Sequence, residues 1–242
     1  QMWQARFDQF SRSMMTENAD LQEQIEEFSK QNNNLISAQV APDGLLTPGQ
    51  VYAQNVEAVV AISNQATTNI YGQITETASS GSGFILTDDG YVVSNYHVVE
   101  GATTLTVTTH AGDKYTAELI GYDDTNDLSL LKVEATDLPA AELGSSNELI
   151  VGDQVAAIGN PLGELTYSMT VGYVSSKDRY VNTDGTPINM MQLDAAINSG
   201  NSGGPLFDMR GTVVGIITAK YSGTTGSGTS IEGIGFAIPI ND

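Results

Sequence analysis

The chain of 242 residues contains no cysteine and only two histidines. The absence of cysteine excludes disulfides, thiolate nucleophiles and zinc sites built on Cys. Because His97 and His110 are the only histidines, a His-rich metal site is excluded as well, and we expect neither a metal nor a cofactor. The sequence also lacks the run of about 18 apolar residues that a membrane-spanning helix needs.

Cations are scarce in this chain. Lys and Arg total 9 against 29 Asp and Glu, which gives a net charge of −20. Nucleic acid is excluded as a partner because phosphate binding needs clustered cations, and docking on anionic lipid is disfavoured for the same reason. The simplest interpretation of the excess acid is solubility. Apolar residues make up 40% of the chain and charged residues 16%, so its bulk is globular.

Residues 1–40 contain no glycine and differ in texture from the rest of the chain. Apolar residues recur there at every seventh position: Phe7, Met14, Leu21, Phe28 and Leu35. The second position of the heptad seam is occupied by Trp3 and Phe10 in the first part of the segment, but by Glu and Gln in the later part. The pattern predicts an amphipathic helix with a half-polar seam. This helix either mediates self-association or packs on its own domain.

The breakers in "APDGLLTPG" predict a linker over residues 41–49. Short β-branched runs follow it over residues 50–242, separated by Asp-Gly, Gly-Asp and Gly-Ser turns. Many short strands at even spacing predict an all-β fold. About 190 residues are too many for one small barrel, so we expect two packed barrels, over about 50–137 and about 148–242. The segment 136–153 is the expected crossing between them.

The run "INSGNSGGPLF" frames Ser202 with glycines. A serine hydroxyl attacks an acyl carbon only if a base takes its proton, and the oxyanion that forms needs preorganised donors. Glycines let the backbone turn so that N–H groups point into one small space. We therefore expect an oxyanion hole over Gly200, Asn201 and Ser202, with donors from the Gly200 and Ser202 N–H groups. The alternative interpretation is an ordinary tight turn.

The base must be one of two histidines. His97 follows the apolar strand in "GYVVSNYHVV", where a rigid scaffold can aim its ring, whereas His110 lies in a polar turn and is expected to face solvent. A catalytic histidine needs an orienting carboxylate. Asp127 directly precedes the apolar run "LSLL", so we expect it at the start of a strand, beside the core. We expect Asp123 and Asp124 to be solvent-exposed acidic residues of the preceding turn.

The chain order is therefore His97, Asp127, Ser202, which is one of the three orders known for the serine triad. Together, "GSGFI", "DGYVVSNYHVV", "DDTNDLSLLKV", "AIGNPLG" and "LDAAINSGNSGGPLFD" resemble the HtrA (DegP/DegS-type) serine proteases over about residues 50–242. The resemblance implies two six-stranded antiparallel β-barrels of the chymotrypsin/trypsin type. It also implies His97 as general base, Asp127 as its orienter and Ser202 as nucleophile.

The resemblance also has implications for substrate specificity, assembly and cellular location. Ala196 and Ile197 fall at the base of the primary pocket, where the lack of an Asp favours small or medium aliphatic side chains over Lys or Arg. The family implies unfolded protein or peptide substrates, a homotrimer and a place in the bacterial cell envelope. A membrane anchor upstream of Gln1 and a PDZ domain downstream of Asp242 would fit it. We expect part of the resting population to be inactive, and we expect activation to depend on the conformation of three loops, over about 162–170, 176–191 and 220–232.

Other functions compete with this interpretation. A chaperone-like or peptide-binding module would carry the same residues as a silent triad. A lipase or esterase would use G-x-S-x-G before a helix, but Pro205 and the following "GTVVGII" strand argue against that helix. An envelope structural protein, in which the N-terminal helix is the working part, would hydrolyse nothing.

Overall fold

The computed structural model describes residues 44–70, 73–160, 167–182, 187–219 and 233–242. The chain divides into two compact units, residues 1–45 and residues 46–242, and the second unit contains all the elements described here. The helix predicted for residues 1–40 lies outside the described residues, as do the whole of the expected 220–232 loop and parts (162–166 and 183–186) of the other two expected loops.

Most of the second unit consists of short strands. In chain order the elements are α2 (Pro48–Asn55), the 3-10 helix η1 (Val56–Ala58), β1 (Val59–Ile70), β2 (Gln73–Ile85), β3 (Tyr91–Ser94), α3 (Tyr96–Val99), β4 (Thr104–Thr108), β5 (Lys114–Asp123), β6 (Leu128–Val133), the 3-10 helix η2 (Ser146–Glu148), β7 (Gln154–Gly159), β8 (Ser168–Asn182), β9 (Pro187–Leu193), β10 (Pro205–Asp208), β11 (Val213–Thr218) and β12 (Gly235–Pro239).

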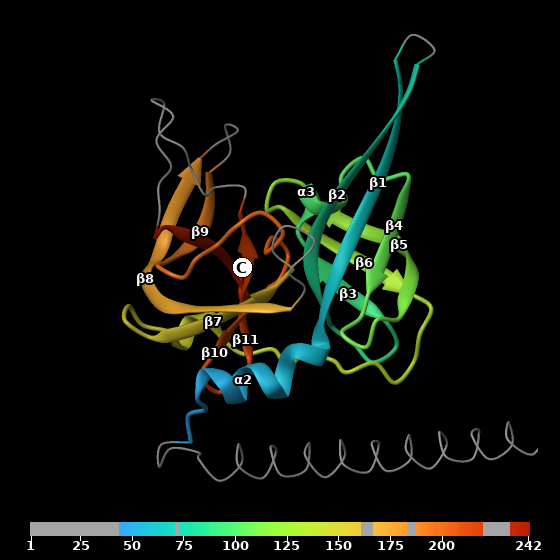
Figure 1. The fold of residues 1–242 in the computed structure, drawn as a ribbon. Coiled ribbons are helices and arrows are strands. Elements are labelled where there is room, and N and C mark those ends of the chain that lie inside the picture. The colour runs from blue at the N-terminus through green and yellow to red at the C-terminus, as the bar shows by residue number, and fades with distance from the viewer. Residues whose placement is uncertain (1–43, 71–72, 161–166, 183–186, 220–232) are drawn as a thin grey trace, which may run out of the picture. The chain divides into compact units, whose positions relative to one another are not determined.

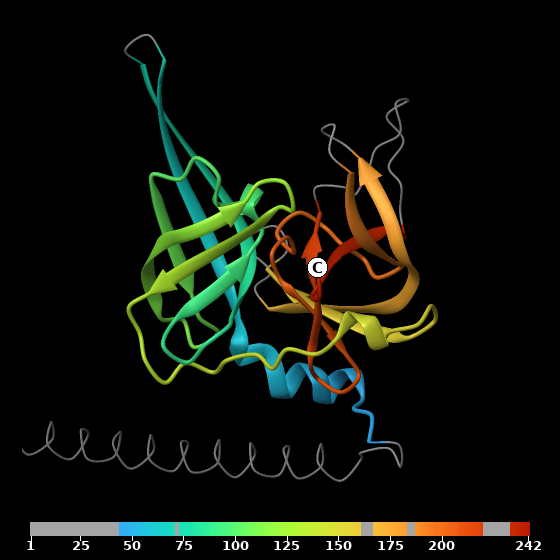
Figure 2. The same cartoon turned by 180° about the vertical axis from the view of Figure 1, so that it is seen from behind.

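These strands close into two antiparallel barrels that stand side by side (Figure 1). The hydrogen-bonded order is β1-β2-β3-β6-β5-β4 in the first and β10-β11-β12-β9-β8-β7 in the second. The predicted pair of six-stranded antiparallel barrels is therefore confirmed. The hairpin of β1 and β2 extends beyond the first barrel, as both views show (Figure 2).

Alternating burial explains why these segments are strands. In β6 every second residue is buried, as expected for a strand with one face on a core, whereas β11 is buried throughout. Each barrel has its own apolar core, and a third cluster joins them through side chains such as Phe84 from β2 and Phe207 from β10. Full burial of one such ring contributes about 1.5–3 kcal/mol. This shared core fixes the two barrels relative to each other.

The segment expected to be a linker ends in a helix. Helix α2 begins at Pro48, and Thr47 and Gln50 form a capping box in which each side chain accepts a hydrogen bond from the other residue's N–H. Val51 is fully buried in the core between the barrels, so α2 is an integral part of the second unit. Among the described helices, none is long and apolar enough to span a bilayer.

The crossing between the barrels follows the expected path and contacts both. The Ala141 N–H donates to the Ile85 carbonyl in the first barrel at 2.9 Å, and the Gly144 N–H donates to the Val213 carbonyl in the second at 2.8 Å. These bonds satisfy backbone groups that a free linker would leave to water.

Candidate active site

His97 lies on the short helix α3 rather than at a strand end as we expected from the sequence. Strand β3 ends at Ser94, and α3 follows after one residue. The Tyr96 N–H and the Asn95 side-chain amide both donate to the Asp127 main-chain carbonyl, at 3.2 and 2.9 Å. The start of α3 is thereby fastened to the residue that precedes β6, and the His97 ring is held beside the Asp127 carboxylate.

Asp127 is buried, with 2% of its surface exposed, and has a left-handed φ of 56°. Its carboxylate accepts from the His97 Nδ1 at 2.7 Å, from the His97 main-chain N–H at 2.9 Å and from the Thr218 hydroxyl at 3.4 Å. Because the carboxylate accepts at Nδ1, that nitrogen carries the proton and Nε2 is left as the basic nitrogen. The pair has the orientation that a histidine base needs.

The turn before Ser202 is closed by a hydrogen bond from the Asn201 N–H to the Asn198 carbonyl at 3.0 Å. Gly200 occupies it with φ of 97°, a conformation that residues other than glycine rarely adopt. Within the part of the chain that the structure describes, the N–H groups of Gly200 and Ser202 donate to no protein acceptor. Both are therefore available to an oxyanion.

The Ser202 hydroxyl accepts a hydrogen bond from the Ala219 N–H at 3.0 Å. It makes none with His97 among the described contacts. The two side chains nevertheless line one cavity of about 260 Å³ between the barrels. The other described residues around this cavity are Ser79, Ser80, Val98, Ser199, Gly200 and Ala219.

The glycines after Ser202 are required by close packing, Gly203 against the first barrel and Gly204 against β7 of the second. Gly203 has φ of 83°, and a Cβ there would overlap the Ser94 hydroxyl and the Ser82 carbonyl. A Cβ on Gly204 would lie 2.6 Å from the Ile158 carbonyl. The run is therefore more than a loose turn, because it carries the serine into contact with the opposite barrel.

The two residues expected to form the specificity pocket lie elsewhere than in this cavity. Ala196 is exposed, and Ile197, with 8% of its surface exposed, belongs to the core of the second barrel. A Cβ on Gly235 would meet the Ile197 side chain at 2.5 Å, so this isoleucine packs against β12. Neither residue is among the described lining of the Ser202 cavity.

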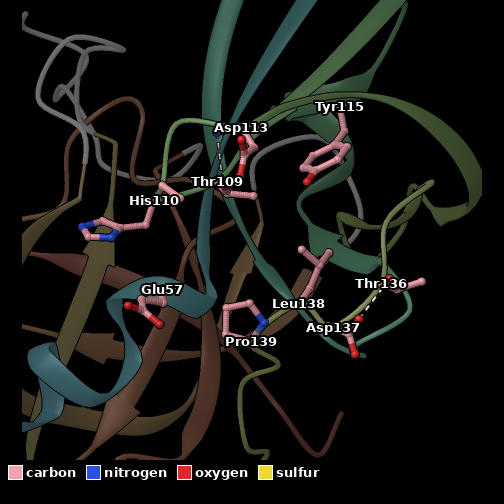
Figure 3. A pocket seen from close by; sticks show the side chains of 10 residues that line it. Glu57, Thr109, His110, Asp113, Tyr115, Thr136, Asp137, Leu138 and Pro139 are labelled. Atoms are coloured by element: carbon pink, nitrogen blue, oxygen red, sulfur yellow. Dashed lines mark hydrogen bonds between the residues drawn. The ribbon is translucent and has the colours of Figure 1, made fainter.

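The second histidine is remote from these groups. His110 is exposed and makes an edge-to-face contact with Tyr167 at 4.8 Å between ring centroids. It borders a separate cavity of about 340 Å³, together with Glu57 and the Thr109–Asp113 turn (Figure 3). Among the described residues no cluster of three metal-ligating side chains occurs.

Asp123 behaves as the turn acid that the sequence suggested. It is exposed, and hydrogen bonds from the Asn126 side chain and main chain hold its pKa below the usual range. Asp123 therefore caps its own turn and does not compete with Asp127 for His97.

Two residues near the site escaped sequence reasoning. Thr218, at the end of β11, supports the Asp127 carboxylate from the second barrel. Ser82, on β2, contacts the backbone on both sides of Asn201. The only local signal for Ser82 was its place between two glycines in "GSGF".

Comparison with known proteins agrees with this geometry. Residues 81–216 match the model of a trypsin-like peptidase domain. A DegP-like periplasmic serine endoprotease of Chlamydia trachomatis is 48% identical over 162 residues, which are 67% of this chain and 32% of that protein. Its counterpart in Hahella chejuensis is 48% identical over 166 residues, or 69% and 34% of the two chains.

Solved structures give the same result. A variant of the HtrA-type protease AlgW with a decapeptide superposes with a TM-score of 0.74 at 32% identity, covering 81% of this chain and 64% of that one. The chain spans about a third of the length of the curated relatives it matches.

Proposed function

Since the chain belongs to the trypsin-like peptidase family and carries an HtrA-type protease domain, we propose that it is a serine endopeptidase that cleaves unfolded or damaged proteins. The observation that carries the proposal is that His97, which is 2.7 Å from Asp127, lines the same cavity as the glycine-framed Ser202. The alternative of a lipase lacks support, because strand β10 and not a helix follows the serine.

The proposed reaction begins with proton transfer. His97 Nε2 takes the Ser202 Oγ proton while Oγ bonds to the scissile carbonyl carbon, and the N–H groups of Gly200 and Ser202 bind the resulting oxyanion. Collapse of this intermediate breaks the C–N bond, and His97 gives its proton to the leaving amine. Water then repeats the sequence on the acyl-enzyme, releasing the acid and free Ser202. Asp127 keeps the ring in the required tautomer throughout.

The position of the Ser202 hydroxyl supports a resting state that must change before reaction. Among the described contacts this hydroxyl makes no hydrogen bond with His97, so it has to reorient toward Nε2 when a substrate binds. We therefore propose that part of the resting population is inactive. A full burst of acyl-enzyme without any effector would contradict this.

We propose that the enzyme prefers small or medium aliphatic residues, such as Val, Ala, Leu or Ile, before the scissile bond. The proposal rests on the described lining of the Ser202 cavity, which offers no carboxylate to a basic side chain. Profiling with a peptide library tests it directly. Dominant cleavage after Arg or Lys would overturn it.

For the environment and assembly of the protein, we propose an extracytoplasmic place in the bacterial cell envelope and a homotrimer. The relatives' names include the word periplasmic, which supports the compartment, and the heptad-like pattern of residues 1–40 supports self-association. Light scattering tests the assembly: we expect three times the chain mass for residues 1–242. A monomer for the full chain that matches a form lacking residues 1–40 would refute the proposal.

The decisive experiment compares casein cleavage by this chain and by Ser202→Ala, with a serine-directed fluorophosphonate as a label. Cleavage that disappears in the variant, with the label on Ser202, supports the endopeptidase. A labelled Ser202 without cleavage indicates a competent nucleophile that awaits a signal. Neither cleavage nor label would favour the chaperone-like module, which is supported by the lack of a His97–Ser202 hydrogen bond among the described contacts.

A further inference from the structure

Ser82, on β2 of the first barrel, takes no part in the triad, yet it is fully buried against the Ser202 turn. Its hydroxyl donates to the Gly200 carbonyl at 2.6 Å and accepts from the Asn160 N–H at 2.7 Å. Because the Asn160 N–H occupies a lone pair of the oxygen, the hydroxyl proton is directed to Gly200. The hydroxyl therefore has one defined orientation, set by the end of β7.

The bond to Gly200 fixes one peptide unit of the turn at both ends. The Gly200 carbonyl and the Asn201 N–H belong to the same planar peptide group. Ser82 holds the oxygen of this group, and the Asn198 carbonyl accepts from its N–H at 3.0 Å. With this peptide unable to rotate, ψ of Gly200 and φ of Asn201 are restrained, directly after the left-handed φ of 97° at Gly200.

The same residue fixes a second peptide unit beyond the nucleophile. The Ser82 main-chain N–H donates to the Ser202 carbonyl at 2.8 Å, and the Gly203 N–H of that peptide donates to the Ile217 carbonyl at 2.8 Å. Ser82 is itself anchored, since its carbonyl accepts from the Ser94 hydroxyl at 2.7 Å. The backbone is therefore clamped on both sides of the Ser202 N–H and on the C-terminal side of the Gly200 N–H.

We propose that Ser82 is a positioning residue that sets the oxyanion hole from the opposite barrel, an inference that rests on the proposed endopeptidase function. Ser82 never contacts the reacting atoms. Its hydroxyl holds the peptide between Gly200 and Asn201, which lies between the peptide that carries the Gly200 N–H and the peptide that carries the Ser202 N–H, and thereby sets the spacing of these two donors. Loss of the hydroxyl leaves a buried carbonyl without its donor and lets the turn relax.

Ser82→Ala tests the role, with Ser146→Ala as the matched control. Ser146 is equally a buried serine, with 3% of its surface exposed, and its hydroxyl likewise gives one hydrogen bond and accepts one, both with Asn241. For a short fluorogenic peptide we expect Ser82→Ala to lower kcat by about 10–100-fold with KM within about twofold, somewhat less than loss of a direct oxyanion donor. Ser146→Ala should keep kcat.

A peptide boronate provides a readout that packing alone would not change. Its tetrahedral adduct with Ser202 places an oxygen in the oxyanion position, so Ser82→Ala should weaken boronate binding by the same factor as kcat/KM. Ser82→Cys keeps a donor at this position, although the thiol is slightly larger and donates more weakly, so its kcat should fall between that of the parent chain and that of Ser82→Ala. This variant carries the test if Ser82→Ala does not fold.

The outcomes separate this role from the proposed function. If the parent chain cleaves but the Ser82 variants keep its kcat, or if Ser146→Ala loses as much, the positioning role is wrong. If kcat falls while boronate affinity is unchanged, the role is also wrong, because the hole is then intact. A parent chain without Ser202-dependent cleavage or fluorophosphonate labelling overturns the proposed function, and the role of Ser82 with it.

Discussion

The carboxylate of Asp127 accepts hydrogen bonds from two donors of His97 in a buried position, and replacing it isolates a single interaction. Asp127→Asn preserves the shape of the side chain but offers an amide where Nδ1–H needs an acceptor, so the ring adopts the wrong tautomer. We expect kcat to fall by about 10⁴-fold. Steady-state cleavage of a peptide substrate measures this.

Asp123→Asn is the matched control for that experiment, because it changes a carboxylate of the same loop that is exposed and bonded to Asn126. Its kcat should stay within about twofold, in line with the small effect of surface changes. A loss of less than about tenfold in Asp127→Asn would remove Asp127 from the proposed triad.

Gly203 and Gly101 share a positive φ, of 83° and 68°, but differ in the space around them. A Cβ on Gly203 would overlap the Ser94 hydroxyl and the Ser82 carbonyl, whereas one on Gly101 meets nothing within 4 Å. We expect Gly101→Ala to cost only the backbone strain, about 1 kcal/mol of unfolding free energy. Gly203→Ala should cost more than about 3 kcal/mol or prevent folding.

Urea unfolding of both variants measures the difference. Equal losses would mean that the turn can move away from the first barrel, and the close packing described for Ser202 would then be incorrect. Equal losses would also weaken the role assigned to Ser82, since that role depends on the same contact.

At the scale of residues, the sequence predicted which residue types belong to the candidate site better than it predicted their contacts. The order of His97, Asp127 and Ser202 and the glycine frame were readable because each depends on local types and spacing. The contact between Ser82 and Gly200 joins positions 118 apart, and no local pattern encodes such a pairing. Likewise, Ile197 could not be recognised as core because its packing partner Gly235 lies on a distant strand.

Tyr167 immediately precedes β8 and ties that strand to the first barrel, because its hydroxyl donates to the Thr108 carbonyl of β4 at 3.1 Å. Burial raises the pKa of Tyr167 to about 12. Since the folded pKa lies above the unfolded value of about 10, the stabilisation is complete below about pH 10. It is lost as the pH rises through the folded value.

Tyr167→Phe should therefore be less stable than the parent chain at about pH 9, by about 1 kcal/mol for the lost hydrogen bond. This gap should shrink as the pH approaches about 11.5, because only the parent has a buried phenol to ionise at this position. Urea midpoints of the two proteins across this range measure the effect. A gap that is constant with pH would show that Tyr167 ionises like an exposed tyrosine.

At the scale of elements, the linker predicted over residues 41–49 was wrong at its end, where Pro48 and Gly49 begin helix α2, and this error has a definite physical origin. Pro and Gly in "LLTPGQ" were interpreted as breakers, and both do interrupt helices in their interior. Here Pro48 stands at the first helical position, where its missing N–H costs nothing, and Thr47 and Gln50 have the spacing of a capping box. The sequence therefore contained the signal for the start of a helix, but this signal was interpreted as a linker.

At the scale of the whole molecule, the two barrels were predictable because their cause is distributed over the entire chain. Each strand repeats the same β-branched pattern, and misreading any one of them leaves the fold unchanged. The shared core between the barrels was not predictable in detail. It combines side chains such as Val51 of α2 and Phe207 of β10, which are brought together only by the completed topology.

The net charge of −20 also belongs to this scale, and it opposes folding because the compact state concentrates like charges. Among the described residues, ion pairs offset little of this repulsion. The Arg210–Glu148 pair, 2.8 Å apart, is largely exposed on both sides (61%/63%), and Lys132–Glu134 joins a lysine to a 98% exposed glutamate. Exposed pairs of this kind contribute about 0–1 kcal/mol each. Repulsion should therefore exceed attraction in the electrostatic balance.

Salt should consequently stabilise this protein. The screening length falls from about 30 Å at 0.01 M to about 8 Å at 0.15 M salt, which suppresses long-range repulsion more than close pairs. We expect the melting temperature to rise by about 2–4 °C over this range, corresponding to about 1 kcal/mol. Sodium and tetramethylammonium chloride should act alike at equal ionic strength. A rise with sodium alone would indicate a bound cation, and a fall would mean that the ion pairs outweigh the repulsion.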